Sequence, residues 1–182
     1  SSSLNMERYI PTNKYNNEKK IVIGWTGTFS SKEYLESLET MFKELSKRVD
    51  FKLLIIGNFD YELEGVDLEV IKWNEKTEIL DLCKIDIGVY PLPQDDWVLG
   101  KSGLKALQYM ALGLPTVATD VGTTPMIISH MIDGWLVSED NEAWIDALET
   151  LIKDAGLRKK LGENARKRII ENYSTVKISN QY

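Results

Sequence analysis

Two lysines and a glutamine recur on one side of a helix predicted within residues 100–115. Lys101, Lys105 and Gln108 are spaced so that they share one helix face. Gly103, and the glycine that opens the segment, would let a ligand come close to the backbone. Cations in a first helical turn oppose the helix dipole unless an anion binds there. The pattern therefore indicates a diphosphate site at a helix N-terminus, with a solvated helix face as the alternative.

The other side of this helix is apolar. Leu104, Leu107 and Ala111 recur at helical spacing and are expected to face the core. Tyr109 and Met110, near the helix end, are interpreted as core residues as well.

Six apolar runs alternate with helical patterns and supply the elements that must position these residues. The runs are 21–25, 51–56, 68–71, 85–90, 115–118 and 135–137. Continuous apolar strands flanked by helices are typical of a parallel sheet covered on both faces. The sequence thus predicts an α/β fold, a Rossmann-like doubly wound parallel sheet of about six strands.

Helix signals lie between these runs. One amphipathic helix is expected from Ser30 or Ser31 through Leu45, a short one over 77–84, and one over 102–112 that ends at Gly113. Thr124, as an N-cap before a proline, predicts a helix to about residue 131. Two terminal helices follow, the first behind Asp140 and the second over 157–172.

Ligands of doubly wound sheets bind beyond the carboxyl ends of the strands, so the loops there are the candidate sites. These loops are 27–30, 57–58, 72–74, 91–103 and 119–123.

Three other features are weaker candidates for a functional site. His130, the single histidine, lies on the helix before the sixth strand, away from these loops, and is interpreted as structural or surface. Cys83, the single cysteine, lies in an apolar stretch, which argues against disulfides, zinc and a cysteine nucleophile. A basic run near the end is interpreted as a solvated face, with contact to the inner membrane surface as the alternative; it comprises Arg158, Lys159, Lys160, Arg166, Lys167 and Arg168.

Composition limits the classes of function. The 182 residues are 43% hydrophobic, enough for one core, and the net charge of −6 provides no general attraction for nucleic acid. No apolar run approaches the length of a membrane span, and the cysteine usage fits a cytoplasmic location. Residues 1–20 are polar and predicted to be a linker, with the domain over 21–182. The start at Ser1 without Met leads us to expect a piece of a longer chain or a processed product.

The segment 100–115, followed by Thr116-Val117-Ala118-Thr119 and Val121-Gly122, resembles the signature of group 1 (family 4) glycosyltransferases of the GT-B fold. The resemblance extends from residue 21 to about 174 and includes the Gly27 loop, the fourth strand ending at Pro91, the turn at Asp133-Gly134 and the closing Asn172-Tyr173-Ser174. It implies the C-terminal, donor-binding domain of an enzyme that transfers a sugar from a nucleotide diphosphate with retention.

The resemblance also implies roles for single residues. Lys101 and Lys105 would stabilise the departing diphosphate, and the nucleotide sugar would be held by Gly27, Thr28, Lys72, Trp73, Gly103, Leu104 and Gln108. The base would lie near Lys72 and Trp73, although core packing is an equal alternative for that indole. A UDP- or GDP-linked donor is expected, with an N-terminal acceptor-binding domain as partner, and no metal, cofactor or nucleic acid.

Two positions depart from the family pattern. Gln108 stands where a glutamate usually holds the ribose, and Gly100 stands where another reaches the donor sugar. Asp95 or Asp96 could replace the glutamate missing at Gly100, although a solvated turn is the preferred interpretation of both. Thr28 stands where the family has a phosphate-binding arginine, so the cations available to a phosphate are Lys32, Lys101 and Lys105. These departures favour the alternative of a degenerate nucleotide-binding or regulatory domain. A phosphorelay receiver and a nicotinamide enzyme are excluded because the first-strand loop lacks acidic residues and a Gly-x-Gly-x-x-Gly pattern.

Overall fold

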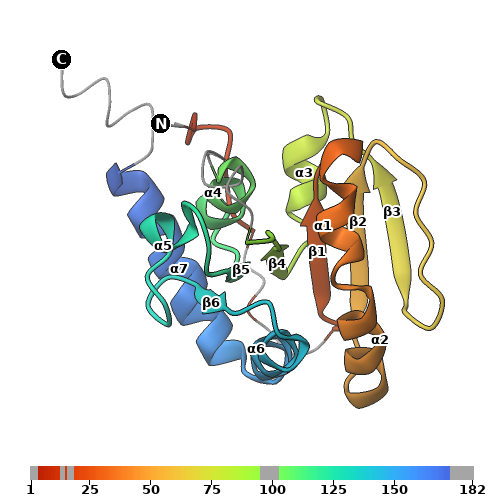
Figure 1. The fold of residues 1–182 in the computed structure, drawn as a ribbon. Coiled ribbons are helices and arrows are strands. Elements are labelled where there is room, and N and C mark those ends of the chain that lie inside the picture. Colours follow the sequence, from red (N-terminus) through yellow and green to blue (C-terminus); the bar gives the residue numbers. More distant parts are fainter. Residues whose placement is uncertain (1–3, 13–14, 16–18, 95–102, 173–182) are drawn as a thin grey trace.

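The structure is a computed structural model that describes residues 4–12, 15, 19–94 and 103–172. Within them lies one parallel sheet with the strand order β3-β2-β1-β4-β5-β6 (Figure 1). The strands are β1 (Val22–Thr26), β2 (Lys52–Gly57), β3 (Leu68–Lys72), β4 (Ile87–Tyr90), β5 (Thr116–Thr119) and β6 (Trp135–Val137). The order reverses at β1, which pairs with β2 on one side and β4 on the other. The predicted doubly wound fold is confirmed, and the switch point lies between β1 and β4.

Alternate residues of each strand point to opposite faces and belong to two separate core clusters. On β2, Leu53 and Ile55 pack in the cluster under α1 (Lys32–Glu36), α2 (Glu39–Arg48) and α6 (Asn141–Lys153). Leu54 and Ile56 pack in the cluster under α3 (Glu78–Leu82), α4 (Leu104–Ala111), α5 (Thr124–Ile127) and α7 (Ala155–Asn172). Burial on both faces explains why the strands read as continuous apolar runs.

The helix expected from Ser30 to Leu45 is wrong as a single element. It is divided into a 3-10 turn, η1 (Phe29–Ser31), followed by α1 and α2. The Ser37 hydroxyl donates to the Tyr34 carbonyl at 2.6 Å, and the Leu38 N–H donates to Leu35 instead. The serine side chain thus takes the carbonyl that a continuous helix would give to the backbone.

The later helices follow the sequence signals with one further correction. Gly113 ends α4 in the left-handed conformation, with φ 72°, and the Asp140 carboxylate accepts from the Glu142 N–H at the start of α6. The fifth helix ends at Ile127 rather than near residue 131, and its N-cap is Thr123. Backbone at Ile128 is extended, which allows the Asp133 carboxylate to accept from the Ser129 N–H at 2.7 Å.

The N-terminal segment packs on the domain. Leu4, Met6 and Tyr9 are buried in the cluster shared with α4 and α7. The Arg166 guanidinium on α7 donates to the Tyr9 carbonyl at 2.6 Å and also to the Ala111 carbonyl at the end of α4. The boundary between a linker over 1–20 and a domain from 21 stays a prediction, but the described part of this segment is fixed by side chains of the domain.

Candidate donor site at the strand ends

A cavity of about 310 Å³ opens at the carboxyl ends of β1 and β4, at the switch point of the sheet. One wall is the loop and 3-10 turn after β1, and the other is the N-terminus of α4. The polar side chains that line it are Thr28, Ser30, Ser31 and Lys105, and Gly103 and Leu104 line it beside them. Four of the residues predicted to bind the donor therefore line one cavity: Thr28, Gly103, Leu104 and Lys105.

The wall after β1 is held in shape by its own hydrogen bonds. The Thr28 N–H donates to the Ser31 hydroxyl at 3.1 Å, and the Thr28 and Ser30 hydroxyls lie 2.8 Å apart. The Phe29 N–H donates to the Asn58 amide oxygen at 2.8 Å, which ties this wall to the loop after β2. The result is a fixed edge of exposed hydroxyl groups.

Gly27, predicted to bind the donor, does not line the cavity. It is buried, and its N–H donates to the Ile56 carbonyl at 3.1 Å. A Cβ atom there would lie 2.4 Å from the Trp25 ring and 2.6 Å from the Ser31 hydroxyl. Close packing therefore accounts for this glycine.

The second wall presents the N-terminus of α4. Gly103 occupies the N-cap position, and no side chain of the described residues caps the helix there. The first N–H groups of an α-helix have no partner within the helix, so they can bind an anion. Leu104 was expected to face the core, but its side chain is 40% exposed and lines the cavity. That expectation was wrong because the helix begins at Leu104, where no neighbouring turn covers the side chain.

Gly103 has a structural reason to be glycine. Its φ is 74°, in the left-handed region, and an added Cβ would lie 2.3 Å from the Ile127 Cδ1. Backbone conformation and packing against α5 explain the residue, whether or not a phosphate approaches it.

Lys105 brings a cation to the cavity. It is partly buried, and burial lowers the pKa of its ammonium group, while nearby Glu78 raises the pKa and so opposes the shift. A negatively charged ligand in the cavity would favour the charged form of Lys105 and so offset the free-energy cost of burying its ammonium group. The second predicted cation, Lys101, lies outside the described residues, as do Gly100, Asp95 and Asp96. Lys32 lies elsewhere, because its ammonium group is 5.3 Å from the centre of the Phe59 ring.

Tyr109 holds the base of the cavity together. It is fully buried, as predicted for a core residue, and its hydroxyl accepts from the Thr26 N–H at 3.0 Å and donates to the Val89 carbonyl at 3.2 Å. Burial raises the pKa of this hydroxyl, which keeps it protonated. One side chain of α4 thus connects the ends of β1 and β4.

Gln108 and Trp73 meet at a carboxylate that the sequence did not single out. The Trp73 indole N–H donates to one oxygen of Glu78 at 2.6 Å, and the Gln108 amide donates to the other at 3.4 Å. The same amide nitrogen donates to the Tyr9 hydroxyl at 3.1 Å. Trp73 is 42% exposed, so the core alternative for its ring is wrong. Nothing in the spacing signals Glu78, since its partners are 5 and 30 residues away.

Lys72 does not join this group. It lines a separate cavity of about 480 Å³ beside β3, together with the loop over residues 58–62. The predicted base-binding pair is therefore divided, with Trp73 next to Glu78 and Lys72 facing another hollow.

The basic run near the C-terminus is not one solvated face. Arg158 is 1% exposed and donates to the carbonyls of Leu151 and Ile152 at the end of α6. Arg168 pairs with Asp133 at 3.1 Å and donates to the Met126 carbonyl. The lysines of the run are exposed, but these arginines and Arg166 join helices. The expectation failed for them because carbonyl groups at the ends of other helices accept their hydrogen bonds.

His130 also has a structural role. Its Nδ1 accepts from the Leu136 N–H at 3.1 Å, and its ring lies edge-on to Trp135. This supports the structural interpretation of the single histidine. Among the described residues no cluster of His, Cys, Asp or Glu could hold a metal ion, and none of their helices has the length and apolar character needed to cross a bilayer.

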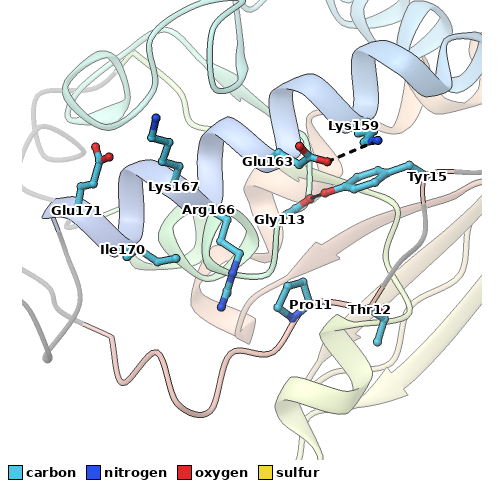
Figure 2. A pocket seen from close by; sticks show the side chains of 10 residues that line it. All are labelled: Pro11, Thr12, Tyr15, Gly113, Lys159, Glu163, Arg166, Lys167, Ile170 and Glu171. Atoms are coloured by element: carbon cyan, nitrogen blue, oxygen red, sulfur yellow. Dashed lines mark hydrogen bonds and ion pairs between the residues drawn. The ribbon is translucent and has the colours of Figure 1, made fainter.

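A larger cavity, of about 570 Å³, lies between the N-terminal segment and α7 (Figure 2). Tyr15 points toward Gly113 and its hydroxyl donates to that carbonyl at 2.6 Å, while Lys159 pairs with Glu163 on the helix. Gly113 precedes the amino end of β5, so this end of the cavity is at the opposite edge of the sheet from the strand-end loops. None of the residues predicted to bind the donor lines it, and the smaller cavity is the better candidate for the site.

Comparison with known proteins identifies the family. The family model described as "Glycosyl transferases group 1" matches residues 8–168. N-acetyl-alpha-D-glucosaminyl L-malate synthase of Bacillus anthracis is 29% identical over 172 residues, covering 91% of this chain and 45% of that protein. This chain thus spans less than half the length of that relative.

Solved structures share the fold. The C-terminal domain of LpcC, a group 1 glycosyl transferase family protein of Francisella tularensis, superposes with a TM-score of 0.74 at 20% identity, covering 94% of this chain and 99% of that domain. Alr3699/HepE of Anabaena, solved with UDP-glucose, has a TM-score of 0.75 at 14% identity, covering 98% of this chain and 54% of that one.

Proposed function

The chain belongs to the group 1 glycosyl transferases, and we propose that it is the donor-binding domain of a glycosyltransferase. The observation that supports this most is the cavity between the hydroxyl-rich loop after β1 and the N-terminus of α4, which no described side chain caps, with Lys105 among the lining residues. Backbone N–H groups, hydroxyls and one cation converge there, and these are the groups that bind a diphosphate.

In this proposal the bond between the anomeric carbon of the sugar and the diphosphate breaks while an acceptor oxygen bonds to that carbon with retention. The acceptor proton passes to the departing nucleoside diphosphate. Lys105, Lys101 and the first N–H groups of α4 stabilise the negative charge as it develops. The acceptor is held by an N-terminal domain that completes the cleft.

The nucleoside end of the donor would lie toward Gln108 and Trp73. The exposed indole offers a face for a base, and Lys72 is near it in the chain. A UDP- or GDP-linked sugar is the donor we propose, and UDP is the first choice for experiment because Alr3699/HepE was solved with UDP-glucose on this fold. A cytoplasmic enzyme, with peripheral contact to the inner membrane surface as an alternative, fits the same proposal.

Calorimetric titration with UDP, GDP and ADP tests this proposal. We expect one of them to bind with high-micromolar or weaker affinity, because half of the cleft is absent and the ligand stays partly exposed. A chain that gives no heat and no thermal stabilisation with any of the three at millimolar concentration would not be a donor domain.

The alternative is a domain that binds nucleotides but no longer supports transfer. The engagement of the Gln108 amide by Tyr9 and Glu78 favours it, because the side chain is already committed within the domain. Sugar transfer or donor hydrolysis by the full-length protein separates the two. Binding without any turnover by that protein would favour the alternative.

A further inference from the structure

The cavity of about 570 Å³ between the N-terminal segment and α7 has no role in the donor proposal (Figure 2). Pro11, Thr12 and Tyr15 form one wall, and side chains of α7 form the other. Tyr15 closes one end, because its hydroxyl donates to the Gly113 carbonyl, and a Cβ atom on Gly162 would lie 2.7 Å from the hydroxyl oxygen. The volume is within the range of small-molecule sites, roughly 300–1,000 Å³.

Arg166 brings a positive charge to this cavity. Its Nη1 donates to the carbonyls of Tyr9 and Ala111, whereas its Nε and Nη2 have no partner within the described residues. Burial lowers the pKa of the guanidinium, and Tyr15 is the neighbour that opposes this shift. A partly buried guanidinium with unused donors is stabilised by an anion beside it.

The other two arginines of α7 already have carboxylates near them. Arg168 pairs with Asp133 at 3.1 Å, and the charges of Asp86 and Asp154 raise the pKa of Arg158. No carboxylate of the described residues forms an ion pair with Arg166. The anion that Arg166 lacks must therefore come from a ligand.

The apolar part of the wall restricts the class of that ligand. Pro11, the Tyr15 ring and Ile170, which is 46% exposed, line the same cavity, and its surface is mainly apolar. Figure 2 shows Arg166 on the side of α7 that faces Pro11, whereas Lys167 extends from the other side of the helix. A ligand with an anionic head and an apolar body can contact both parts of the wall.

A carboxylate suits the head better than a phosphate. Its two oxygens can accept parallel hydrogen bonds from one guanidinium. Glu163 and Glu171 also line the cavity, and Glu163 pairs with Lys159 at 3.9 Å. A dianionic phosphate is repelled by these carboxylates more strongly than a group with a single charge.

We infer that this cavity binds a monocarboxylate with an apolar chain, the class of a medium-chain fatty acid, with its head on Arg166 and its chain along Pro11 and Ile170. The inference is independent of the donor proposal, because the end of the cavity at Gly113 is at the opposite edge of the sheet. The occupant contacts both the N-terminal segment and α7, so its binding stabilises the attachment of that segment.

Titration of the whole ¹⁵N-labelled chain with decanoate, followed by NMR, tests this inference. We expect a dissociation constant on the order of 1 mM, with shifts of the amides of Thr12, Gly113 and Ile170 and none in the loop after β1. Butyrate has the same head without the long chain, and decyltrimethylammonium has the same chain with the opposite charge. Each should bind at least about tenfold more weakly than decanoate. Equal binding of the cation would overturn the inference, since apolar contact alone would then explain it.

A substitution beside Arg166 tests the position of the head while keeping the arginine and its structural hydrogen bonds. Ile170→Glu places a carboxylate four residues after Arg166, where the two side chains can pair along the helix. The melting temperature should stay within about 2 °C or rise, while the affinity for decanoate falls at least about tenfold. Ile170→Gln is the matched control without charge and should stay within about threefold of the unmodified chain. Lys160→Gln, at an exposed position outside the cavity, should not change the affinity.

Unchanged affinity in Ile170→Glu, or an equal loss in Ile170→Gln, would overturn the assignment of the head to Arg166. Association with phosphatidylglycerol vesicles without any binding of decanoate would make this face of α7 a membrane contact and would also overturn it. Decanoate should leave the affinity for UDP unchanged within about twofold, because the two cavities are separate. A chain that binds decanoate but no nucleotide would contradict the proposed function and leave this inference standing.

Discussion

At the scale of single residues, Lys105 is the clearest link between fold and chemistry. Its ammonium group is partly buried at the edge of the cavity, and burial lowers its pKa below the ordinary lysine value. A base with a lowered pKa destabilises the folded chain as long as the pH keeps it charged, and the destabilisation disappears as the pH rises to the ordinary value of 10.5. The free domain therefore holds a charge that a bound anion would stabilise.

Replacement of this lysine should have opposite effects on stability and binding. Lys105→Gln should leave the free chain as stable as before or slightly more stable at neutral pH, because a partly buried charge at a helix N-terminus is removed. It should weaken nucleoside diphosphate binding by roughly 1.5–3 kcal/mol, or about 10- to 150-fold, through the lost charge-assisted contact.

Thermal melting and calorimetry on the same variant measure the two effects. Lys32→Gln is the control, because that ammonium group lies over aromatic rings near the loop after β1 and should affect affinity less than about threefold. Equal affinity of Lys105→Gln and the unmodified chain would remove Lys105 from the site.

At the scale of elements, the start of α4 depends on one backbone conformation. Gly103 has φ 74° and is packed against Ile127, whereas Gly65 has φ 85° with open space around it. These two glycines separate the cost of backbone strain from the cost of a steric clash.

Gly65→Ala should lower the free energy of unfolding by about 1–2 kcal/mol through strain alone. Gly103→Ala should lower it by at least ~1 kcal/mol more, because its Cβ also displaces Ile127. Urea unfolding of both variants gives the difference. Equal values would show that α5 yields without cost, and a loss of nucleotide binding in Gly103→Ala could then be assigned to the cavity itself.

On helix α7, the charged side chain of Arg158 has a structural role. Arg158 is buried and donates to two carbonyls that α6 leaves unpaired at its end. Arg158→Met keeps most of the volume but leaves those carbonyls without donors, and should cost at least ~2 kcal/mol of stability.

Lys160→Met, a nearby exposed position, should change stability by less than ~0.5 kcal/mol. Chemical denaturation of the two variants compares them directly. If Arg158→Met were as stable as Lys160→Met, the buried hydrogen bonds would contribute nothing measurable.

At the scale of the whole molecule, the N-terminal segment acts as part of the domain. Leu4, Met6 and Tyr9 fill the side of the core under α4 and α7, and Arg166 reaches back to the Tyr9 carbonyl. In the proposed two-domain enzyme this segment would connect the halves, so the connection is packed against the donor domain beside Gln108.

A chain that begins at Lys19 lacks the three buried side chains Leu4, Met6 and Tyr9. Burial of one such side chain contributes up to about 1.5–3 kcal/mol, so the free energy of unfolding should fall by roughly 3 kcal/mol or more. Urea unfolding of the truncated and intact chains measures this. Arg8→Ala, an exposed position in the same segment, is the control and should be near neutral. A truncated chain of unchanged stability would support the linker predicted over 1–20.

The sequence by itself determined the order of elements, the parallel sheet and the family. Each strand is an apolar run that lies within a residue or two of its prediction, and Gly113 and Asp140 end and begin helices as expected. These features are local, because hydrophobic periodicity, caps and left-handed glycines depend on neighbours a few residues away. The edge of the sheet that holds the cavity follows from the same pattern, since all strands run in one direction.

Only the tertiary structure decided which side chains meet. Glu78 contacts Gln108 across 30 residues, and Tyr9 reaches the same amide across 99. The arginines of α7 donate to carbonyl groups where other helices end, and Lys72 lines a cavity beside β3 while the adjacent Trp73 contacts Glu78. Such contacts depend on strand order and helix packing, which bring together residues whose spacing in the sequence has no helical or strand period. For this reason the sequence located the edge of the sheet where the donor is proposed to bind but missed Glu78.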